Sequence, residues 1–471
     1  MYLLAEAADA AAHAPPGWVT ALFGGLLLCM VVALALEEKL HAKKSVITGI
    51  GAIVCLLAGQ ALDVLPEGPA LLQGHELHLP IYVAAIDWEV IAIILGASLF
   101  VDVTSKSGIF TWIAVKLTKL SRGDPRRLLW FYGALTVAFS AFLNNVTAMI
   151  IVGSLTAVSL KRLKLQGKLL GFLFVEGLMT NVGGLLTLIS SVPNIIVGNA
   201  AGISFGRFFL VASPYVLLAT VASIYLGQRV FQVAPLADDE ARAAAAAQVD
   251  AFDENDGIRS RRFFNLAAGM FVLFILGLAL QSQLPLVGGE HGLGMGFVAL
   301  AFAAGMLLLY KHEVDKFYAA VDWDLLAFFG CLFVVIFVME HAAVLSTMGQ
   351  GLAWLLDRGE NLGVVLLLWS AAGLSSVTDN IPLSAMLAKI LPQGRELTAS
   401  SMEWWAVIFG ANLGGNLTPI GSASTVVAVT IMAKQGVPVT FVRFVRLAVP
   451  FAGLQLALAS GYVLLVKALI T

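Results

Sequence analysis

Long apolar stretches separated by short polar loops dominate the hydrophobic pattern of this sequence. A helix needs about 20 apolar residues to cross a bilayer. Stretches of this character lie at 18–36, 45–64, 88–115, 207–230, 263–283, 295–310, 323–341 and 444–468. Further apolar stretches that are interrupted by Gly, Pro or small polar residues lie at 128–160, 169–200, 361–394 and 401–433. The pattern predicts an all-α polytopic membrane protein.

Composition agrees with this pattern and excludes several classes of protein. Of the 471 residues, 59% are hydrophobic and only 12% are charged, where a soluble domain has roughly 25% charged residues. The formal net charge is −2, and no basic stripe is present that would follow a phosphate backbone, so we expect no nucleic-acid partner. Without a GxGxxG or P-loop motif we expect no cofactor beyond the coupling ions, sodium or protons. The expected partners are membrane lipid and a small ion substrate.

The distribution of Lys and Arg predicts the orientation in the membrane, because these residues collect in cytoplasmic loops. The basic loops are 37–44, 116–127, 161–168, 229–262 and 311–316. The loops without Lys or Arg, 65–80 and 284–294, should face outside. We therefore expect an external N-terminal segment at 1–17 and a multi-pass protein of the plasma membrane, the inner membrane in a bacterium.

The interrupted stretch 128–160 has a cytoplasmic basic loop at each end, so it must begin and end on the same side. This predicts a re-entrant hairpin whose middle reads SAFLNNVT at 140–147. Hydrocarbon offers no hydrogen bonds to the paired Asn residues at such a depth. They must find partners in protein, water or ligand.

The two halves of the chain repeat one another. Asp87 and Asp322 begin matching segments, and the same offset in numbering carries Asn144-Asn145 onto Asp379-Asn380. The Asn-x-Gly-Gly segment at Asn181 matches that at Asn412 with a slightly smaller offset. The predicted orientations are opposite, which indicates inverted-topology repeats with two re-entrant hairpins and two broken helices, an architecture of secondary transporters. The expected units are repeats at 18–228 and 263–471, joined by a cytoplasmic linker at 229–262.

Polar residues within the four interrupted stretches are the candidate ion and substrate ligands. Unwound backbone carbonyls with Asn, Thr and Ser oxygens suit a hard cation, whereas the N–H groups of half-helix N-termini suit an anion. Both signs of ligand remain open, and no metal other than transported sodium is expected. The candidates are Asn144, Asn145, Thr147, Asn181, Thr187, Asn194, Thr378, Asp379, Asn380, Asn412, Thr418 and Ser422.

Three carboxylates within apolar stretches are candidates for a proton relay, because burial of a charge in a membrane is costly and marks a function by default. Asp379 would be the cation or proton site, or else a structural acceptor that holds the hairpin. Glu176, five residues before Asn181, would be a second proton site or a packing acceptor. Asp102 would be a relay or a partner for Lys106.

The motifs at these positions resemble those of the ion transporter superfamily that contains the arsenite permease and sodium/proton antiporter families (ArsB/NhaD), and most closely its P-protein-like branch. Citrate and dicarboxylate carriers are remoter relatives. The motifs are EEKLHAKK at 37–44, SAFLNNVTAMI at 140–150, NVGGLLTLISSVPNIIVGNAAGISF at 181–205, SSVTDNIPL at 375–383 and GANLGGNLTPIGSASTVVA at 410–428. The resemblance implies an elevator-type carrier, often a homodimer, whose site is lined by residues of these motifs.

Two departures from the P-like pattern affect the expected substrate. Asn144-Asn145 stands where relatives show Asp-Asn, and Ser190-Ser191-Val192-Pro193-Asn194 stands where they show Gly-Asp-Pro-Pro-Asn. The leading prediction is sodium/proton antiport at Asp379, because one carboxylate with amide and carbonyl oxygens suits competing sodium and protons. The alternative is a sodium- or proton-coupled anion carrier of arsenite, citrate or dicarboxylate type, which would rely on helix N-termini and amides.

Two readings from other classes are weaker. A membrane-embedded enzyme would need a nucleophile with its base or a metal constellation, and the scattered histidines form no such motif. The sequence therefore predicts no enzyme. A passive channel does not need inverted hairpins, and flux without coupling or saturation would identify it.

Overall fold

The computed structural model describes residues 15–66, 70–72, 75–77, 79–281, 294–311 and 314–470. Most of the expected external segment at 1–17 and of the expected outer loop at 284–294 lies outside these residues. Helices make up nearly all of the described chain. Its one pair of strands, β1 and β2, forms a short antiparallel hairpin in which Ala70 pairs with Leu77. The fold is therefore all-α apart from this hairpin.

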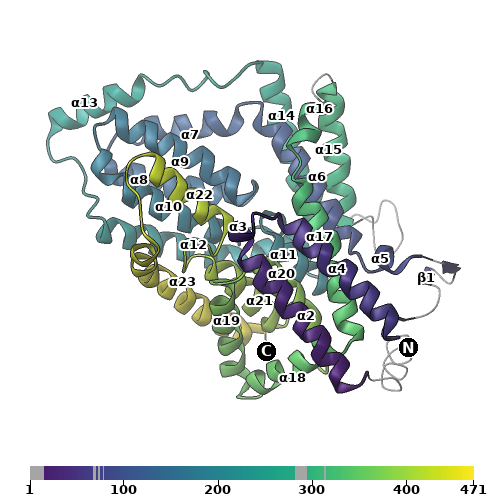
Figure 1. The fold of residues 1–471 in the computed structure, drawn as a ribbon. Helices are drawn as coiled ribbons and strands as arrows, with labels where there is room; N and C mark the ends of the chain where they lie inside the picture. Colours follow the sequence, from purple (N-terminus) through teal and green to yellow (C-terminus); the bar gives the residue numbers. More distant parts are fainter. Residues whose placement is uncertain are drawn as a thin grey trace.

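The first half contains the following elements (Figure 1): α2 (Gly17–Ala35), α3 (Glu37–Leu40), α4 (Lys44–Ala61), β1 (Ala70–Leu72), β2 (His75–Leu77), α5 (Ile81–Ala84), α6 (Trp88–Ser105), α7 (Ile109–Leu120), α8 (Pro125–Ser140), α9 (Asn145–Arg162), η1 (Gln166–Lys168), α10 (Leu169–Gly183), η2 (Leu188–Ser190), α11 (Val192–Ala200) and α12 (Phe205–Val230). Within the linker, α13 spans Asp239–Asp250.

The second half contains α14 (Arg261–Leu280), α15 (Gly294–Leu309), α16 (Val314–Ala320), α17 (Trp323–His341), α18 (Val344–Leu356), α19 (Glu360–Ser375), α20 (Asn380–Ile390), α21 (Met402–Gly414), α22 (Ala423–Lys434) and α23 (Phe441–Ile470). The helices α17, α18, α19 and α20 start at a constant offset from α6, α7, α8 and α9, taken in order. The same offset separates Asn144 from Asp379. The ends of α10 and α21 have the same spacing as Asn181 and Asn412. Helix boundaries thus follow the offsets of the sequence motifs.

Seven helices in the described part are long and apolar enough to cross a membrane: α2, α4, α6, α12, α14, α17 and α23. Their outward side chains are strongly apolar. Leu210 on α12 is 72% exposed, and Leu308 on α15 and Leu469 on α23 are each 76% exposed. Lipid accepts such a surface, whereas water does not. The chain is a multi-pass membrane protein.

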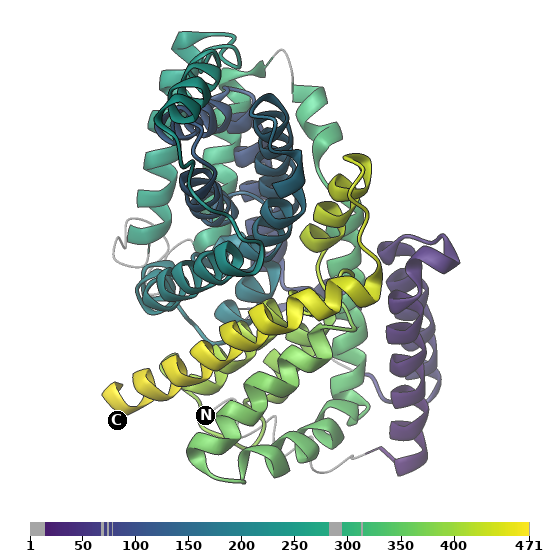
Figure 2. The same ribbon diagram turned by 90° about the vertical axis from the view of Figure 1, so that its left-hand side faces the viewer.

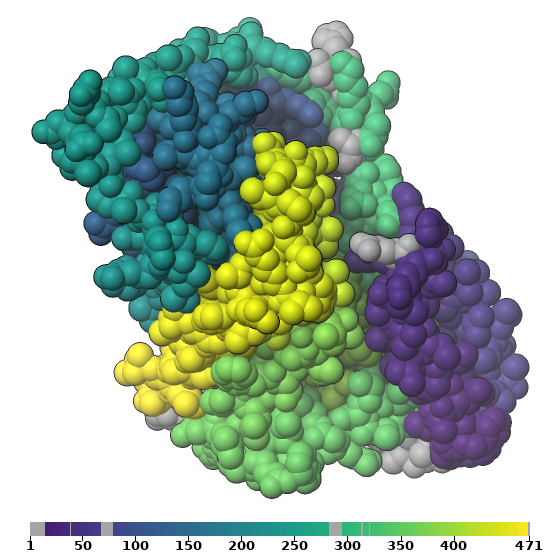
Figure 3. Space-filling view, turned by 60° about the vertical axis from the view of Figure 1, so that its left-hand side comes forward, coloured from purple at the N-terminus to yellow at the C-terminus, as the bar shows by residue number. Residues whose placement is uncertain are grey.

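Two groups of helices divide the molecule. In Figure 1, α6, α15 and α17 stand together on the right, beside α4, whereas α8, α9, α10 and α22 form a cluster on the left. The helix α23 runs across the molecule as the long yellow helix of Figure 2 and packs on α12, α19 and α21. Figure 3 shows the N-terminal helices at the right-hand edge, separate from this C-terminal helix. The helices α8, α9, α10 and α22 therefore occupy a different part of the molecule from α2 and α4.

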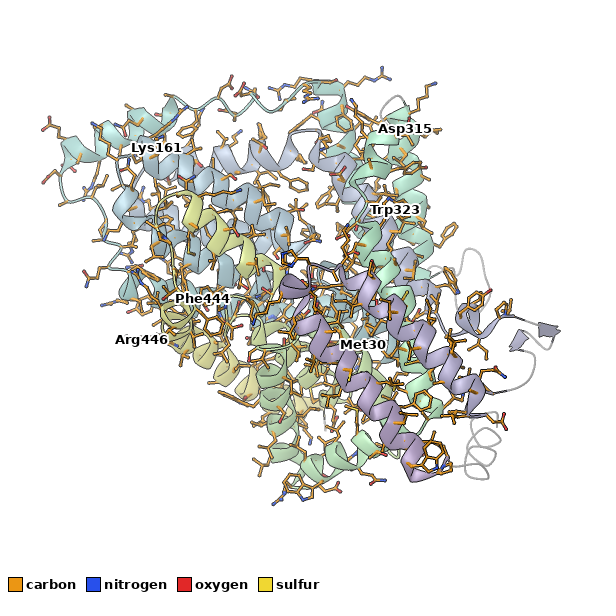
Figure 4. All side chains as sticks on the ribbon, in the orientation of Figure 1. Met30, Lys161, Asp315, Trp323, Phe444 and Arg446 are labelled. Carbon is orange, nitrogen blue, oxygen red and sulfur yellow. The ribbon has the colours of Figure 1, made fainter. Side chains whose placement is uncertain are left out.

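Two of the predicted basic loops lie toward the same edge. Figure 4 labels Lys161, at the end of α9, and Asp315, on α16, and both lie near the upper edge of that view. Met30 of α2 and Phe444 of α23 lie lower. The assignment of 161–168 and 311–316 to the cytoplasmic side stays a prediction.

One expected span was wrong in detail. The stretch 88–115 is not one helix, because α6 ends at Ser105 and α7 begins at Ile109. Gly108 adopts a left-handed conformation (φ 83°), which ends the first helix at little steric cost. Ala343, its counterpart in the second half, is also left-handed (φ 58°) and separates α17 from α18. The helix α18 had no counterpart among the predicted elements.

Candidate functional site

Two helix hairpins turn at short polar segments, which we call the first tip (residues 140–147) and the second tip (residues 375–382). Asn144 begins α9 as its N-cap and accepts a hydrogen bond from the Val146 N–H (2.9 Å). Asp379 begins α20 in the same way and accepts from the Ile381 N–H (3.0 Å). Asn and Asp are both good N-caps because their side-chain oxygens accept the free N–H groups of a first turn. The local sequence therefore explains both turns.

Each tip is held against a helix break, and the same bonds recur in both halves. We call residues 183–191 the first break and residues 414–422 the second break. Ser140 donates to the Thr180 carbonyl (2.6 Å), and its counterpart Ser375 donates to the Ala411 carbonyl (2.5 Å). Likewise Thr187 donates to the carbonyl of Ala141, as Thr418 does to that of Ser376. Both hairpins are fastened to their own half by equivalent hydroxyl groups.

Close backbone approach at the breaks requires glycine. A Cβ added at Gly183 would lie 2.6 Å from the Val137 carbonyl oxygen, and one at Gly414 would meet the backbone of Ala372. At the neighbouring Gly184, a Cβ would lie 3.0 Å from the Asn145 amide nitrogen. The Gly-Gly pairs let the hairpin arms pack directly on the broken helices.

A buried polar network joins the two breaks. Asn181 donates to Ser422 (3.0 Å), and in the reciprocal pair Ser191 donates to Asn412 (2.7 Å). Asn412 also donates to the side-chain oxygen of Asn194 (2.9 Å). Each break is thus completed by a side chain from the other half.

This network continues into the long helices. Asn181 donates to Asn416 (2.9 Å), which donates to Gln455 of α23 (2.8 Å). Gln455 in turn donates to Ser223 of α12 (3.0 Å). Sequence reasoning missed Gln455 and Ser223, although each is a polar residue in a strongly apolar span.

The candidate ligands fall into two groups by exposure. The buried ones have their polar atoms engaged in the network or in the bonds between tip and break: Asn181, Thr187, Asn194, Asn412 and Thr418. The exposed or half-buried ones gather at the tips and at the start of α22: Asn144, Asn145, Thr147, Thr378, Asp379, Asn380 and Ser422. Only the second group has polar side chains that are at least partly exposed.

A lysine from outside the four polar segments reaches the second tip. The ammonium nitrogen of Lys44, the first residue of α4, lies 2.5 Å from Oδ2 of Asp379. The two side chains are 33% and 15% exposed, respectively. The sequence predicted that an anion would rely on helix N-termini and amides alone. Lys44 provides a positive charge at this tip in addition. Lys44 belongs to the EEKLHAKK motif, so the signal was present, but its partner was not predictable.

Neither of the other predicted relay carboxylates reaches a tip through a hydrogen bond. Glu176 is fully buried in α10, where one oxygen accepts from Thr156 (2.6 Å) and the other has no partner among the described residues. One oxygen of Asp102 in α6 also has no hydrogen-bond partner among the described residues, although the carboxylate interacts electrostatically with Lys106.

Two cavities of about 560 and 780 Å³ lie elsewhere, at the corner between α7 and α8. The smaller is lined mainly by basic residues of the predicted cytoplasmic loop, among them Lys119, Arg122 and Arg127. The larger is lined by Arg122 and Arg127 together with Trp130, Phe131 and residues of the linker. No tip residue lines either cavity. We place the candidate site at the tips because the polar groups and the paired charges converge there. The described residues contain no cluster of three or more His, Cys, Asp or Glu side chains suited to a metal.

The sequence profile of a known family covers most of this arrangement. The profile described as a citrate transporter matches residues 18–410, which include both tips and the first break. The chain belongs to the citrate transporter family. This membership makes it a transporter rather than an enzyme, and it agrees with the resemblance to the ArsB/NhaD-type superfamily.

Several relatives support membership in this citrate transporter family. The chain is 30% identical over 438 residues to the 46 kDa membrane protein of Mycobacterium leprae, covering 91% of this chain and 95% of the relative. It is 25% identical to the P protein of Mus musculus, covering 93% of this chain but only 59% of that protein. The P protein match agrees with the predicted branch.

Two solved structures share the fold. The YdaH transporter of Alcanivorax borkumensis superposes with a TM-score of 0.58 at 14% identity, covering 91% of this chain and 98% of the other. MtrF of Neisseria gonorrhoeae gives a TM-score of 0.55 at 13% identity, covering 89% and 94%. At such low identity these likenesses concern the fold alone. The citrate transporter family member described here thus has a transporter fold.

Proposed function

We propose that the chain is a secondary active carrier that moves a small organic carboxylate across the membrane together with a coupling cation. The observation that carries this proposal is the character of the accessible tip residues. The amide groups of Asn144, Asn145 and Asn380 donate no hydrogen bond among the described residues, and they lie at the N-termini of α9 and α20. Free amide donors at two helix N-termini suit a carboxylate.

The coupling cation, sodium or a proton, is assigned to Asp379. It is the one carboxylate in the accessible group of candidate ligands, and an acid at a membrane-buried tip is a functional group by default. Membership in the citrate transporter family supports the anionic cargo. Glu176 and Asp102, each with one carboxylate oxygen that has no hydrogen-bond partner in the described part of the chain, complete the proposed proton relay.

The proposed transport cycle uses two inverted repeats, whose hairpins re-enter the membrane and move with the broken helices as an elevator against the remaining helices. Support comes from the constant offset between four pairs of helix starts and from the equivalent hydrogen bonds of both halves. Broken helices with such pseudo-symmetry are a recurring basis for alternating access. We further propose a homodimer in the bacterial inner membrane with its N-terminus outside.

The test uses proteoliposomes that contain the purified full chain. Uptake of radiolabelled citrate and succinate is measured with an inward sodium gradient, with an inward proton gradient and with neither. The proposal expects saturable accumulation that needs one of the gradients and that Asp379→Asn reduces to the level of empty vesicles. Uptake that neither saturates nor responds to a gradient would instead indicate a passive channel.

Sodium/proton antiport is the second candidate, favoured by the single accessible carboxylate at the tips. A pH-sensitive dye inside the same vesicles reports proton movement when sodium, lithium or potassium is added without any carboxylate. A sodium-dependent proton flux that Asp379→Asn abolishes, with no uptake of citrate, succinate or arsenite, would replace the anion carrier with the antiporter.

A further inference from the structure

Asp379 has no free oxygen in this conformation. Its Oδ1 accepts the N-cap hydrogen bond from Ile381 (3.0 Å), and its Oδ2 contacts the ammonium group of Lys44 (2.5 Å). A cation at Asp379 needs at least one of these oxygens. The N-cap bond belongs to the fold of the tip, so the oxygen held by Lys44 is the one that a cation would take.

Lys44 is fixed on the opposite group of helices. The next residue, Ser45, donates a hydrogen bond to Asp324 at the start of α17, and Thr48 donates to the Lys44 carbonyl (2.9 Å). The helix α4 packs along α17. Glu37 lies 3.9 Å from the same ammonium group and provides a second, weaker counter-charge. The Lys44–Asp379 pair therefore bridges the α4–α17 group and the second tip.

The helices beside the first tip form a similar framework, but without a Lys–Asp pair. Glu89, the counterpart of Asp324, accepts a hydrogen bond from the Gly296 N–H (2.8 Å), so α15 stands on α6 as α4 stands on α17. Gly294 and Met295, which precede Gly296, carry no charge. The first tip has neutral Asn144 in place of Asp379, and no described Lys or Arg bonds to it. A lysine and a carboxylate thus meet at the second tip, whereas no such pair is formed at the first tip among the described residues.

We propose that Lys44 is an internal competitor for the coupling cation at Asp379 and thereby determines when this site can be loaded. The proposal rests on the assignment of Asp379 as the cation site in the proposed function. While the ion pair is closed, Asp379 is neutralised and the second tip is held against α4. A sodium ion or proton displaces the Lys44 ammonium, which frees the tip to move with its cargo.

Sodium binding by the purified full chain tests this proposal without any carboxylate. The thermal unfolding temperature is followed as NaCl replaces choline chloride at constant ionic strength. Lys44→Met should reach half-maximal stabilisation at a sodium concentration about tenfold or more below that of the wild type. The reason is that an adjacent positive charge changes the proton affinity of a carboxylate by about ten- to a thousandfold, and we expect a comparable effect on sodium. Asp379→Asn and the double variant should show no sodium response.

Lys43→Met is the matched control, because Lys43 is the exposed neighbour and makes no ion pair among the described residues. It should titrate like the wild type, as should Lys44→Arg, which keeps the charge. Equal sodium titrations for Lys44→Met and the wild type would overturn the proposal.

A folding failure of Lys44→Met is also informative. The double variant Lys44→Met with Asp379→Asn gives the second tip the neutral arrangement of the first tip, so the proposal expects it to fold and elute as a single species. Failure of the double variant as well would contradict the equivalence of the two halves on which the proposal depends. Absence of carboxylate uptake and of antiport in vesicles would refute the proposed function alone, since sodium binding is measured separately.

Discussion

The two tips differ in charge while their backbones are built alike. Asn144 and Asp379 occupy the same N-cap position and accept the same hydrogen bond, at 2.9 and 3.0 Å. The neutral amide of the first tip shows that the cap does not require a carboxylate. The negative charge of Asp379 is therefore not needed for folding of the hairpin, and its paired lysine indicates that it serves another purpose.

The breaks differ much less than the tips. The bonds from Ser140 and Ser375 to the broken helices have nearly the same length, 2.6 and 2.5 Å. Each joins a tip to the broken helix of the same half. The halves thus share a common frame and diverge at the accessible ligands. A carrier that binds two different ions needs this combination, because one frame then supports two unlike sites.

The largest expected effect concerns the shared frame. Asn412→Ala leaves the Ser191 hydroxyl and the Asn194 side-chain oxygen without their partner, and Asn181→Ala does the same to the side-chain oxygen of buried Asn416. Each substitution should lower the free energy of unfolding by about 3 kcal/mol, since an unsatisfied buried polar group costs about 1–3 kcal/mol. Thermal unfolding in detergent measures the change. Asn144→Ala, which removes only a cap, should cost about 1 kcal/mol; an equal loss for all three would show that the breaks are not special.

The next prediction concerns a carboxylate placed at the first tip, where no lysine is paired with it among the described residues. Asn144→Asp keeps the N-cap but adds a charge to which no described cation bonds. We expect a loss of about 2 kcal/mol, somewhat below the roughly 2.5–3.5 kcal/mol for a charge at the centre of a membrane helix, because Asn144 is exposed. Thermal unfolding and carboxylate uptake are both measured. A variant as stable and active as the wild type would mean that Asp379 needs no counter-ion either.

The next prediction compares the two threonine hydroxyl groups that hold the tips, and it expects equal, small losses in the free energy of unfolding. Thr187→Val and Thr418→Val each remove one hydrogen bond to a tip carbonyl. Each should cost about 1 kcal/mol, the usual net value of one hydrogen bond. Thr430→Val, on the exposed side of α22, is the control and should change little. A loss at only one of the two sites would show that the halves fasten their hairpins differently.

The smallest effect concerns the linker, which has no counterpart in the repeat. Lys119 of α7 pairs with Glu254, and this hydrogen bond is the main reason that the pKa of Glu254 lies below its ordinary value. A lowered pKa in the folded state means that the pair stabilises the protein above the ordinary carboxylate pKa and that this contribution disappears as pH falls through the lowered one.

Glu254→Gln should therefore cause a small decrease in unfolding temperature at pH 7 and low salt, and a smaller decrease below the ordinary carboxylate pKa. Scanning fluorimetry at both pH values measures the difference. Because the Glu254 side chain is partly exposed, added salt should weaken the effect at pH 7. A decrease of the same size at the lower pH would mean that the linker is held by something other than this charge.

Much of the frame could be predicted from the sequence, because its parts are encoded locally. The apolar periods located most helices, and the repeated Asn and Gly-Gly motifs located both tips and both breaks. Which candidates are buried could not be predicted, because Asn194 and Asn144 look alike in sequence and differ only in their tertiary contacts. The partner of Asp379 was equally hidden, since Lys44 is 335 residues away in the chain. Short elements such as α18 and β1–β2 could not be predicted, because a hydrophobic pattern identifies a helix or strand only over a longer stretch.

The crossed packing of the two halves has a consequence for biosynthesis. The helix α9 of the first half packs on α22 of the second, and α20 of the second packs on α11 of the first. The first half leaves the ribosome earlier, so Asn181 lacks its partners Asn416 and Ser422 until the second half has been inserted. A chain that ends before α21 therefore cannot complete the polar network between the two breaks.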